Sequence, residues 1–251
     1  MDRWPAETIW EQVSPLLSGF TVEVLPEIDS TNSELMRRAR AGQTAPTLLV
    51  AERQTAGRGR LGRPWQGQPG DSLTFSLSLP LRPRDWSGLS LAVGLSVAES
   101  LHPAIGLKWP NDLWWQDRKL AGILIEAATS GPHSQVVVGI GINIRPCPAT
   151  GLSTPPASLC ELWPQASAGA ALARLTLPLV TALQGFVMTG FAPLQQRYAA
   201  RDVLLGRELS TSDGQTGQGL GVSVTGALRL RQPAGERLID SAEVSVRPQC
   251  P

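Results

Sequence analysis

A glycine- and arginine-rich stretch from Glu52 to Trp65 constrains this chain more than any other feature. It reads E-R-Q-T-A-G-R-G-R-L-G-R-P-W, and no acidic residue follows Glu52. Glycine lets a backbone turn tightly and approach a ligand, and the planar arginine side chain pairs with phosphate or carboxylate oxygens. A solvated basic loop would have the same composition. The apolar, strand-like run 47–51 before the stretch and Trp65 at its end favour a loop that wraps a nucleotide.

Composition excludes several classes of function. The 251 residues are 42% hydrophobic with a net charge of +1, which gives no general attraction to nucleic acid or membrane. No apolar run approaches the roughly 20 residues of a membrane-spanning helix, and the N-terminus lacks the order of a signal peptide. The chain has three scattered cysteines and two histidines, which argues against a disulfide framework, a zinc site and catalysis by a histidine base. We expect a cytoplasmic protein.

The first half of the chain alternates strand and helix patterns. Thr21 to Leu25 is typical of a strand, and a helix follows Asp29-Ser30-Thr31-Asn32, with Thr31 and Glu34 fitting a capping box. Ser and Thr at such a position are commonly just caps, although a helix start also offers free N–H groups to a ligand. Ser72 to Leu79 alternates strictly, which predicts a strand with one buried face, and Leu89 to Leu101 has helical spacing.

A second group of chemically active residues follows that helix. Residues 108–113 read K-W-P-N-D-L, in which Asn111 and Asp112 form a turn that is either a plain loop or points into a cleft. Two strands follow, at 119–126 and 135–144, with Gly122 in the first and Gly139 and Gly141 on one face of the second. Glycines inside strands leave room for a slender ligand or for tight packing against a helix.

The C-terminal third has a different texture. We expect helices over 158–163, 168–188 and 193–201, the second of them kinked or broken at Pro178. Past Asp202, short β-branched runs separated by turn signals predict a small all-β unit. The chain is therefore expected to divide into residues 1–202 and 203–251.

Five blocks of sequence, in order, resemble the biotin protein ligases. They are D-S-T-N at 29–32, E-x-Q-x-A-G-R-G-R-x-G-R-x-W at 52–65, K-W-P-N-D-L at 108–113, K-L-A-G-I-L at 119–124 and G-x-G-I-N at 139–143. Five ordered blocks within about 115 residues are far more specific than a lone glycine motif. The resemblance implies an α+β fold: a mixed-sheet catalytic domain similar to class II aminoacyl-tRNA synthetases, with a small SH3-like β-barrel C-terminal domain.

The resemblance also implies a reaction in two steps. The carboxylate of biotin attacks the α-phosphate of ATP to give biotinyl-5′-AMP, and a lysine of a biotin carboxyl carrier domain, usually that of acetyl-CoA carboxylase, then takes the biotin. Mg²⁺ is expected with ATP. Both steps require neutralised phosphates and exclusion of water from the anhydride, and neither requires a covalent enzyme nucleophile.

Carried over position by position, the resemblance assigns roles to residues of this chain. The catalytic set is Lys119, Arg60 and Asp112, with Asp112 a candidate for positioning the acceptor amine. The biotin set is Ser30, Thr31, Asn32, Gln54, Arg58, Gly59, Arg60 and Lys119. The nucleotide set is Arg58, Arg60, Trp65, Asn111 and Asn143.

The chain departs from the family pattern at one place, and rival readings remain. Ser72 stands where many members have asparagine, which puts the geometry of the loop after Trp65 in doubt.

Only 28 residues precede Asp29, so we expect no DNA-binding repressor activity. A lipoate or octanoate ligase or transferase shares the core fold, but its R-R-x-x-G-G-G loop is missing here. A non-catalytic nucleic-acid-binding module fits the charge poorly. Monomer and homodimer are both open.

Overall fold

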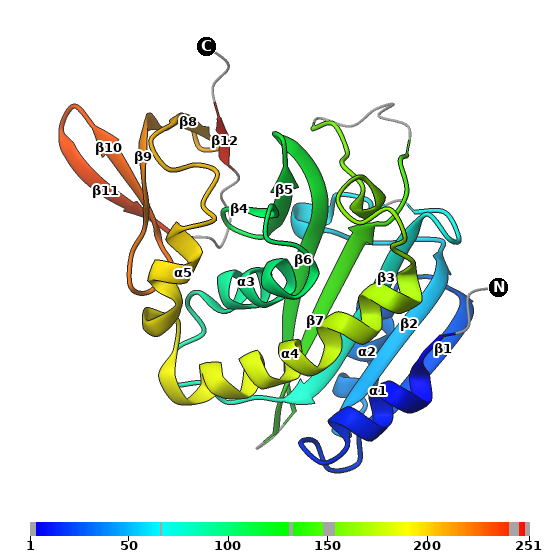
Figure 1. Cartoon of the computed structure of the whole chain (residues 1–251). Helices are drawn as coiled ribbons and strands as arrows, with labels where there is room; N and C mark the ends of the chain where they lie inside the picture. The colour runs from blue at the N-terminus through cyan, green and yellow to red at the C-terminus, as the bar shows by residue number, and fades with distance from the viewer. Residues whose placement is uncertain (1–3, 66, 131–132, 148–153, 241–245, 249–251) are drawn as a thin grey trace.

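A seven-stranded mixed sheet forms the centre of the protein (Figure 1). The computed structural model describes residues 4–65, 67–130, 133–147, 154–240 and 246–248. The strand order is β1-β2-β3-β7-β6-β5-β4; β1 and β2 run parallel and the other neighbours antiparallel. The strands are β1 (Thr21–Ile28), β2 (Thr47–Gln54), β3 (Ser72–Pro80), β4 (Gly106–Lys108), β5 (Asp112–Trp115), β6 (Arg118–Ser130) and β7 (His133–Asn143).

Helices cover both faces of this sheet and bury two separate apolar cores. On one face α1 (Ala6–Val13), α3 (Leu89–Leu101) and α4 (Ala168–Thr189) pack over the larger core, to which β2 contributes Leu48 and Val50. On the other face α2 (Thr31–Arg40) covers a smaller core that includes Leu49. Successive residues of β2 therefore serve opposite faces, as the pleat of a strand requires. The predicted bounds of the helix 89–101 are confirmed.

A second, antiparallel sheet follows the short helix α5 (Gln195–Ala199). Its order is β11-β10-β9-β8-β12, from the strands β8 (Glu208–Thr211), β9 (Thr216–Val222), β10 (Leu228–Gln232), β11 (Gly235–Ile239) and β12 (Val246–Pro248). Leu209, Leu228 and Leu230 belong to the same continuous core as the helices of the main sheet. The indole of Trp109 also joins the two parts, because its Nε1 donates to the carbonyl of Gly226 at 3.0 Å. The division at residue 202 stays a prediction.

The expectation that β3 buries only one face is wrong. Every residue from Ser72 to Leu79 is buried, because α2 and its neighbours cover the polar face as well. The hydroxyls on that face are hydrogen-bonded: Thr74 donates to the carbonyl of Ala51 at 2.8 Å, and Ser76 to Asn32 at 2.7 Å. Burial of these polar groups costs little because each has a partner.

The helical segment also differs from the expected one. Pro178 lies inside the uninterrupted 22-residue helix α4 rather than at a break. The short runs at Leu159–Glu161 and Ala192–Leu194 are 3-10 turns rather than helices, and α5 covers only part of the predicted third helix. By length and composition α4 is apolar enough to cross a membrane, contrary to our expectation for this chain. It buries one side on α3 and the sheet, as core helices do.

Candidate active site

The start of α2 carries a connected set of polar side chains. Ser30, not Thr31, is the N-cap, since its side chain accepts from the N–H of Ser33 at 3.3 Å; the predicted Thr31–Glu34 capping box is therefore wrong. Thr31 lies in the first turn, where its N–H donates to Gln54 Oε1 at 2.8 Å and its hydroxyl lies 2.8 Å from that of Ser76. These groups are buried and face the strands, so the start of α2 is more than a cap.

Glu126 of β6 joins this set to the arginine loop, and the sequence analysis missed it. One oxygen, Oε2, accepts from Asn32 Nδ2 at 2.8 Å and from Arg58 Nη2 at 2.7 Å. Arg58 also donates from Nε to the hydroxyl of Ser33 at 2.9 Å. We call Ser30, Thr31, Asn32, Gln54, Ser76, Arg58 and Glu126 the α2 cluster. Of the expected nucleotide set, Arg58 lies here, beside the expected biotin residues.

Two paired glycines leave space beside the α2 cluster. Gly122 of β6 faces Gly141 of β7 across the ladder, and the indole of Trp65 lies over both. A Cβ on Gly141 would overlap that ring, and a Cβ on Gly139 would overlap Asn32 Oδ1. The strand glycines therefore make room for side chains of this site, and the indole of Trp65 fills the space over Gly122 and Gly141, which we call the glycine slot.

The Gly-Arg loop folds back on itself before it reaches this slot. Gly59 N–H donates to the carbonyl of Arg63 at 2.7 Å, and Trp65 N–H donates to that of Gly57 at 2.8 Å. Arg60 at its tip reaches Asn111 Oδ1 with Nη1 at 3.3 Å. Burial lowers the pKa of the Arg60 guanidinium, and the nearby charge of Asp112 opposes this shift.

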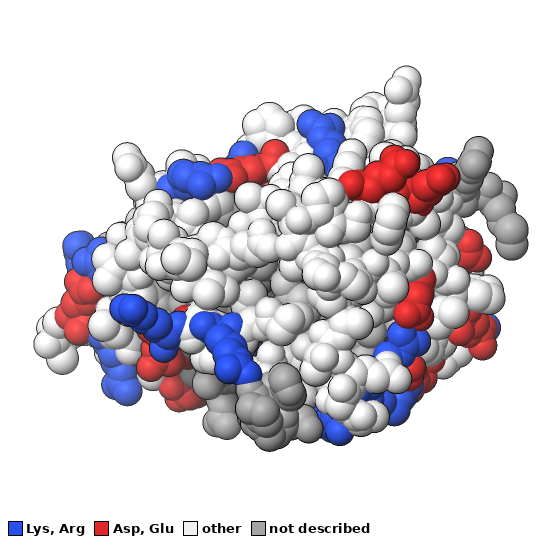
Figure 2. All heavy atoms as spheres, turned by 90° about the horizontal axis from the view of Figure 1, so that it is seen from below, with Lys and Arg blue, Asp and Glu red and all other residues white. Residues whose placement is uncertain are grey.

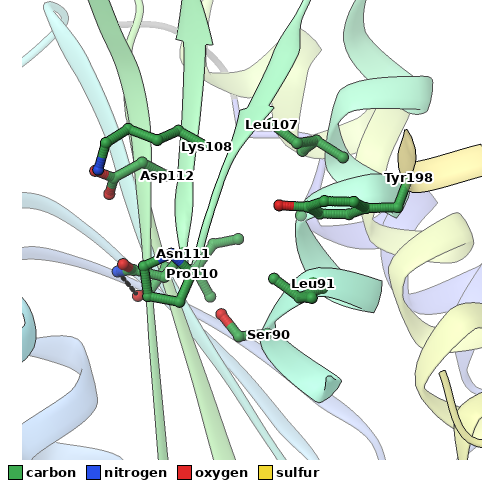
Figure 3. A pocket seen from close by; sticks show the side chains of 10 residues that line it. Ser90, Leu91, Leu107, Lys108, Pro110, Asn111, Asp112 and Tyr198 are labelled. Atoms are coloured by element: carbon green, nitrogen blue, oxygen red, sulfur yellow. Dashed lines mark hydrogen bonds and ion pairs between the residues drawn. The ribbon is translucent and has the colours of Figure 1, made fainter. Parts of the chain in front are cut away.

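Asp112 lies between two lysines. Its Oδ1 is 2.7 Å from Lys119 Nζ, and its Oδ2 is 3.8 Å from Lys108 Nζ. Figure 3 shows the ammonium of Lys108 beside the carboxylate, above a cavity of about 10 Å³ between the turn and α3. Burial lowers the pKa of Lys108 to about 8, although the charge of Asp112 acts against the shift. A single carboxylate among three cations leaves a net positive site, which suits an anionic substrate.

The two predicted asparagines support the backbone of this region. Asn111 Nδ2 donates to the carbonyl of Ile123 at 2.8 Å. Asn143 Nδ2 donates to the carbonyls of Lys119 at 3.2 Å and Ala157 at 3.1 Å, so it holds Lys119 in place. We call Arg60, Lys108, Asn111, Asp112, Lys119 and Asn143 the lysine cluster. Within the described part of the chain, no three His, Cys, Asp or Glu side chains are grouped to hold a metal ion.

Ser72 begins β3 opposite Asn143, and its hydroxyl lies against Gly67 so closely that a Cβ there would overlap it. A side chain at position 67 would therefore displace the hydroxyl of Ser72.

Comparison with known proteins separates the possible functions of such a site. The chain is 35% identical over 240 residues to the biotin--[acetyl-CoA-carboxylase] ligase of Paracoccus denitrificans, covering 88% of this chain and 98% of that relative. The chain belongs to the biotin protein ligase family. The model of the broader biotin/lipoate A/B protein ligase family matches residues 24–143, which contain both clusters.

Two further relatives agree with this membership. The bifunctional ligase/repressor BirA of Escherichia coli is 35% identical over 249 residues, covering 94% of this chain and 77% of BirA. The biotin protein ligase of Aquifex aeolicus, solved in complex with biotin and ATP, superposes with a TM-score of 0.78 at 31% identity, covering 91% of this chain and 99% of that one. The observed α+β fold with a mixed sheet is therefore the fold of this family.

Proposed function

We propose that this chain activates biotin with ATP as biotinyl-5′-AMP and transfers the biotin to a lysine of a biotin carboxyl carrier domain. One observation carries the proposal. The glycine slot, filled by the indole of Trp65, lies between the hydrogen-bonding α2 cluster, whose two charges form an ion pair, and a cationic set around Asp112. Such a site offers polar contacts at one end and charge neutralisation at the other, as a neutral ring with a carboxylate tail and a nucleotide require.

In the first step, a biotin carboxylate oxygen forms a bond to the α-phosphorus of ATP, and the bond to pyrophosphate breaks. Ser30, Thr31, Asn32 and Gln54 hold the polar ureido and carboxylate groups of biotin. Lys119 and Arg60 stabilise the negative charge that accumulates between carboxylate and phosphate, and Arg58 and Gly59 close the loop over the substrates. Preorganised cations in a site without water stabilise such a transition state strongly.

In the second step, the acceptor lysine attacks the carbonyl carbon of the anhydride and AMP leaves. Asp112 attracts the incoming amine in this proposal, which is supported by its being the carboxylate of the lysine cluster. The neutral amine forms the C–N bond and loses one proton to water, while the C–O bond breaks and its electron pair leaves with AMP. Exclusion of water by the loop protects the anhydride between the two steps.

Trp65, Asn111 and Asn143, with Arg58 and Arg60, form the proposed nucleotide side. Mg²⁺ would be bound by the phosphates of ATP, because Asp112 already faces two lysines. Among the described residues, no three His, Cys, Asp or Glu side chains are grouped to hold the ion. It would supply neutralisation of phosphate charge.

Several finer expectations belong to the same proposal. Residues 1–202 form a catalytic domain similar to class II aminoacyl-tRNA synthetases, and residues 203–251 an SH3-like unit. The acceptor is the carrier domain of acetyl-CoA carboxylase, and the protein acts in the cytoplasm as a monomer or homodimer. Lipoate and octanoate are not favoured, because the full-length relatives carry biotin ligase names.

The test is exchange of labelled pyrophosphate into ATP by the purified chain. We expect exchange that depends on biotin and on Mg²⁺, followed by transfer of biotin to an added carrier domain. Lipoate and octanoate serve as matched alternatives. Exchange driven by lipoate and not by biotin would overturn the proposal.

A further inference from the structure

One carboxylate oxygen connects three parts of the site that lie far apart in the sequence. Oε2 of Glu126, in β6, receives the amide of Asn32 from α2 and the guanidinium of Arg58 from the Gly-Arg loop. The partners are 94 and 68 positions away along the chain. No sequence motif singles out Glu126, yet it is the acceptor shared by the α2 cluster and the loop.

The charge of Glu126 fixes the direction of the neighbouring hydrogen bonds. An ionised carboxylate only accepts, so Asn32 must turn its NH₂ group toward Glu126 and its oxygen toward Ser76. Ser76 then gives its single proton to Asn32 Oδ1. The hydroxyl of Thr31 lies 2.8 Å from that of Ser76 and 3.2 Å from Gln54 Oε1, and it can donate to either. The direction of hydrogen bonding is therefore set from Glu126 through Asn32 to Ser76.

Glu126 also fixes one end of the Gly-Arg loop. Arg58 is held by Glu126 and by the hydroxyl of Ser33, immediately before Gly59 and Arg60 extend to Asn111. The ion pair is partly solvated, with side-chain exposures of 41% for Arg58 and 26% for Glu126. Pairs at such exposure contribute little to folding, so a change here alters the site more than the stability.

We propose that Glu126 is a positioning residue for biotin binding, which sets the hydrogen-bond direction of the α2 cluster and docks the Gly-Arg loop against it. The inference rests on the proposed function, because it concerns the same site. Glu126 acts through Asn32 and Arg58, the two partners to which the proposed function assigns biotin.

The variants are Glu126→Ala, which removes both contacts, and Glu126→Gln, which keeps the shape without the charge. We expect the Kd for biotin to rise about 10- to 100-fold in Glu126→Ala and about 3- to 10-fold in Glu126→Gln. The Kd for ATP measured alone should rise less than the Kd for biotin, because Lys108, Asn111 and Lys119 make no contact with Glu126. Both constants are measured by calorimetry beside a thermal melt.

The matched control is Glu236→Gln in the second sheet, where Glu236 pairs with Arg229 at 2.7 Å in a similarly exposed ion pair. It should leave the Kd for biotin unchanged. Arg58→Met and the double variant with Glu126→Gln complete a cycle in which the effects on biotin binding should be strongly non-additive. Additive effects, or an unchanged Kd for biotin in Glu126→Gln, overturn the inference even if Glu126→Ala fails to fold.

The exchange activity of the wild-type chain distinguishes failure of the proposed function from failure of the inference about Glu126. If the wild-type chain shows no biotin-dependent exchange, the proposed function fails and the inference fails with it. If the wild type is active and the Glu126 variants bind biotin normally, only the inference fails.

Discussion

The ammonium of Lys119 lies 2.7 Å from the carboxylate of Asp112 and 5.9 Å from the centre of the Trp65 ring. The same side chain thus contacts the acid proposed for the acceptor step and the ring that lies over the glycine slot. The carboxylate restrains the charge of Lys119 at the edge of that slot. A carboxylate or phosphate that bound beside Trp65 would meet an ammonium already in place, which is the condition for transition-state stabilisation without reorganisation.

Lys119→Met should abolish adenylate formation while leaving the fold intact. The substitution keeps most of the stem and deletes the charge, at a typical cost of about 100- to 1,000-fold in rate for one preorganised donor. Stability should change by less than about 1 kcal/mol, since Lys119 is partly exposed and Lys108 still faces Asp112. Single-turnover formation of biotinyl-5′-AMP, beside a thermal melt, tests this. Near-normal adenylation, or a variant that unfolds, would falsify the assignment.

Arg60→Gly should loosen retention of the adenylate. Arg60 is half-buried at the tip of the loop, where it reaches Asn111, and it is placed to cover the phosphate. Loss of a charge-assisted contact costs about 10- to 150-fold in affinity. The dissociation rate of biotinyl-5′-AMP is the measurement, with Arg84→Gly on an exposed loop as the control. An unchanged rate in Arg60→Gly would contradict the role.

Gly141→Ala should impair the nucleotide side by displacing Trp65. The new Cβ would overlap the indole, and β7 is too well packed on both sides to move away. We expect a higher KM for ATP and a lower melting temperature, and the fall in melting temperature should be smaller when Trp65→Ala is added. Gly185→Ala, whose Cβ would meet open space on α4, should be neutral or slightly stabilising. An unaffected KM for ATP in Gly141→Ala would argue against this packing.

Asp202→Asn should stabilise the protein at neutral pH. Burial raises the pKa of Asp202 from 3.8 to about 6, against the hydrogen bond from the N–H of Leu204. Between these two values the unfolded chain ionises this group while the folded chain keeps its proton, so its contribution to the unfolding free energy falls as pH rises through the window. The gain in Asp202→Asn above pH 6 should be about 1–3 kcal/mol.

Urea unfolding of Asp202→Asn at a series of pH values measures this effect. Glu11→Gln, at an exposed carboxyl on α1, is the control. A variant that loses stability equally at pH 4 and pH 7 would show that the carboxylate is not strained by burial.

We expect no sequence-specific affinity for DNA. The net charge is +1, and on the face shown in Figure 2 acidic and basic side chains are interspersed around an uncharged centre. Phosphate backbones are bound through clustered positive charge. A gel-shift assay at moderate salt tests the expectation, and saturable binding to one duplex would refute it.

The sequence predicts elements where one local pattern decides the structure. Helical spacing alone defines 89–101, and its limits agree with α3. Ser72 to Leu79 shows where local pattern fails. Alternation separates apolar from polar residues, but it cannot distinguish hydroxyls in water from hydroxyls that bond to Asn32 and Ala51 beneath a helix. The uninterrupted α4 is a similar case, since tertiary packing maintains the helix through Pro178.

The candidate site was predictable as far as its motifs reach. The motif residues do gather, at the start of α2 and around Asp112. Glu126 was missed, because its partners are brought near only by the folded sheet. Lys108 stood in a quoted block, but its burial beside Asp112 could not be predicted from the sequence. The sequence also could not predict that Arg58 and Arg60 lie in different clusters, since this depends on how the loop folds back.

The hydrogen bond from Trp109 to Gly226 has a consequence for how the two sheets work together. Trp109 directly precedes the turn that carries Asn111 and Asp112, while Gly226 lies in the connection between β9 and β10. The second sheet therefore supports the turn through this hydrogen bond. The position of Asp112 in the main sheet thus depends, through one indole, on a loop of the second sheet that lies more than a hundred residues later in the chain.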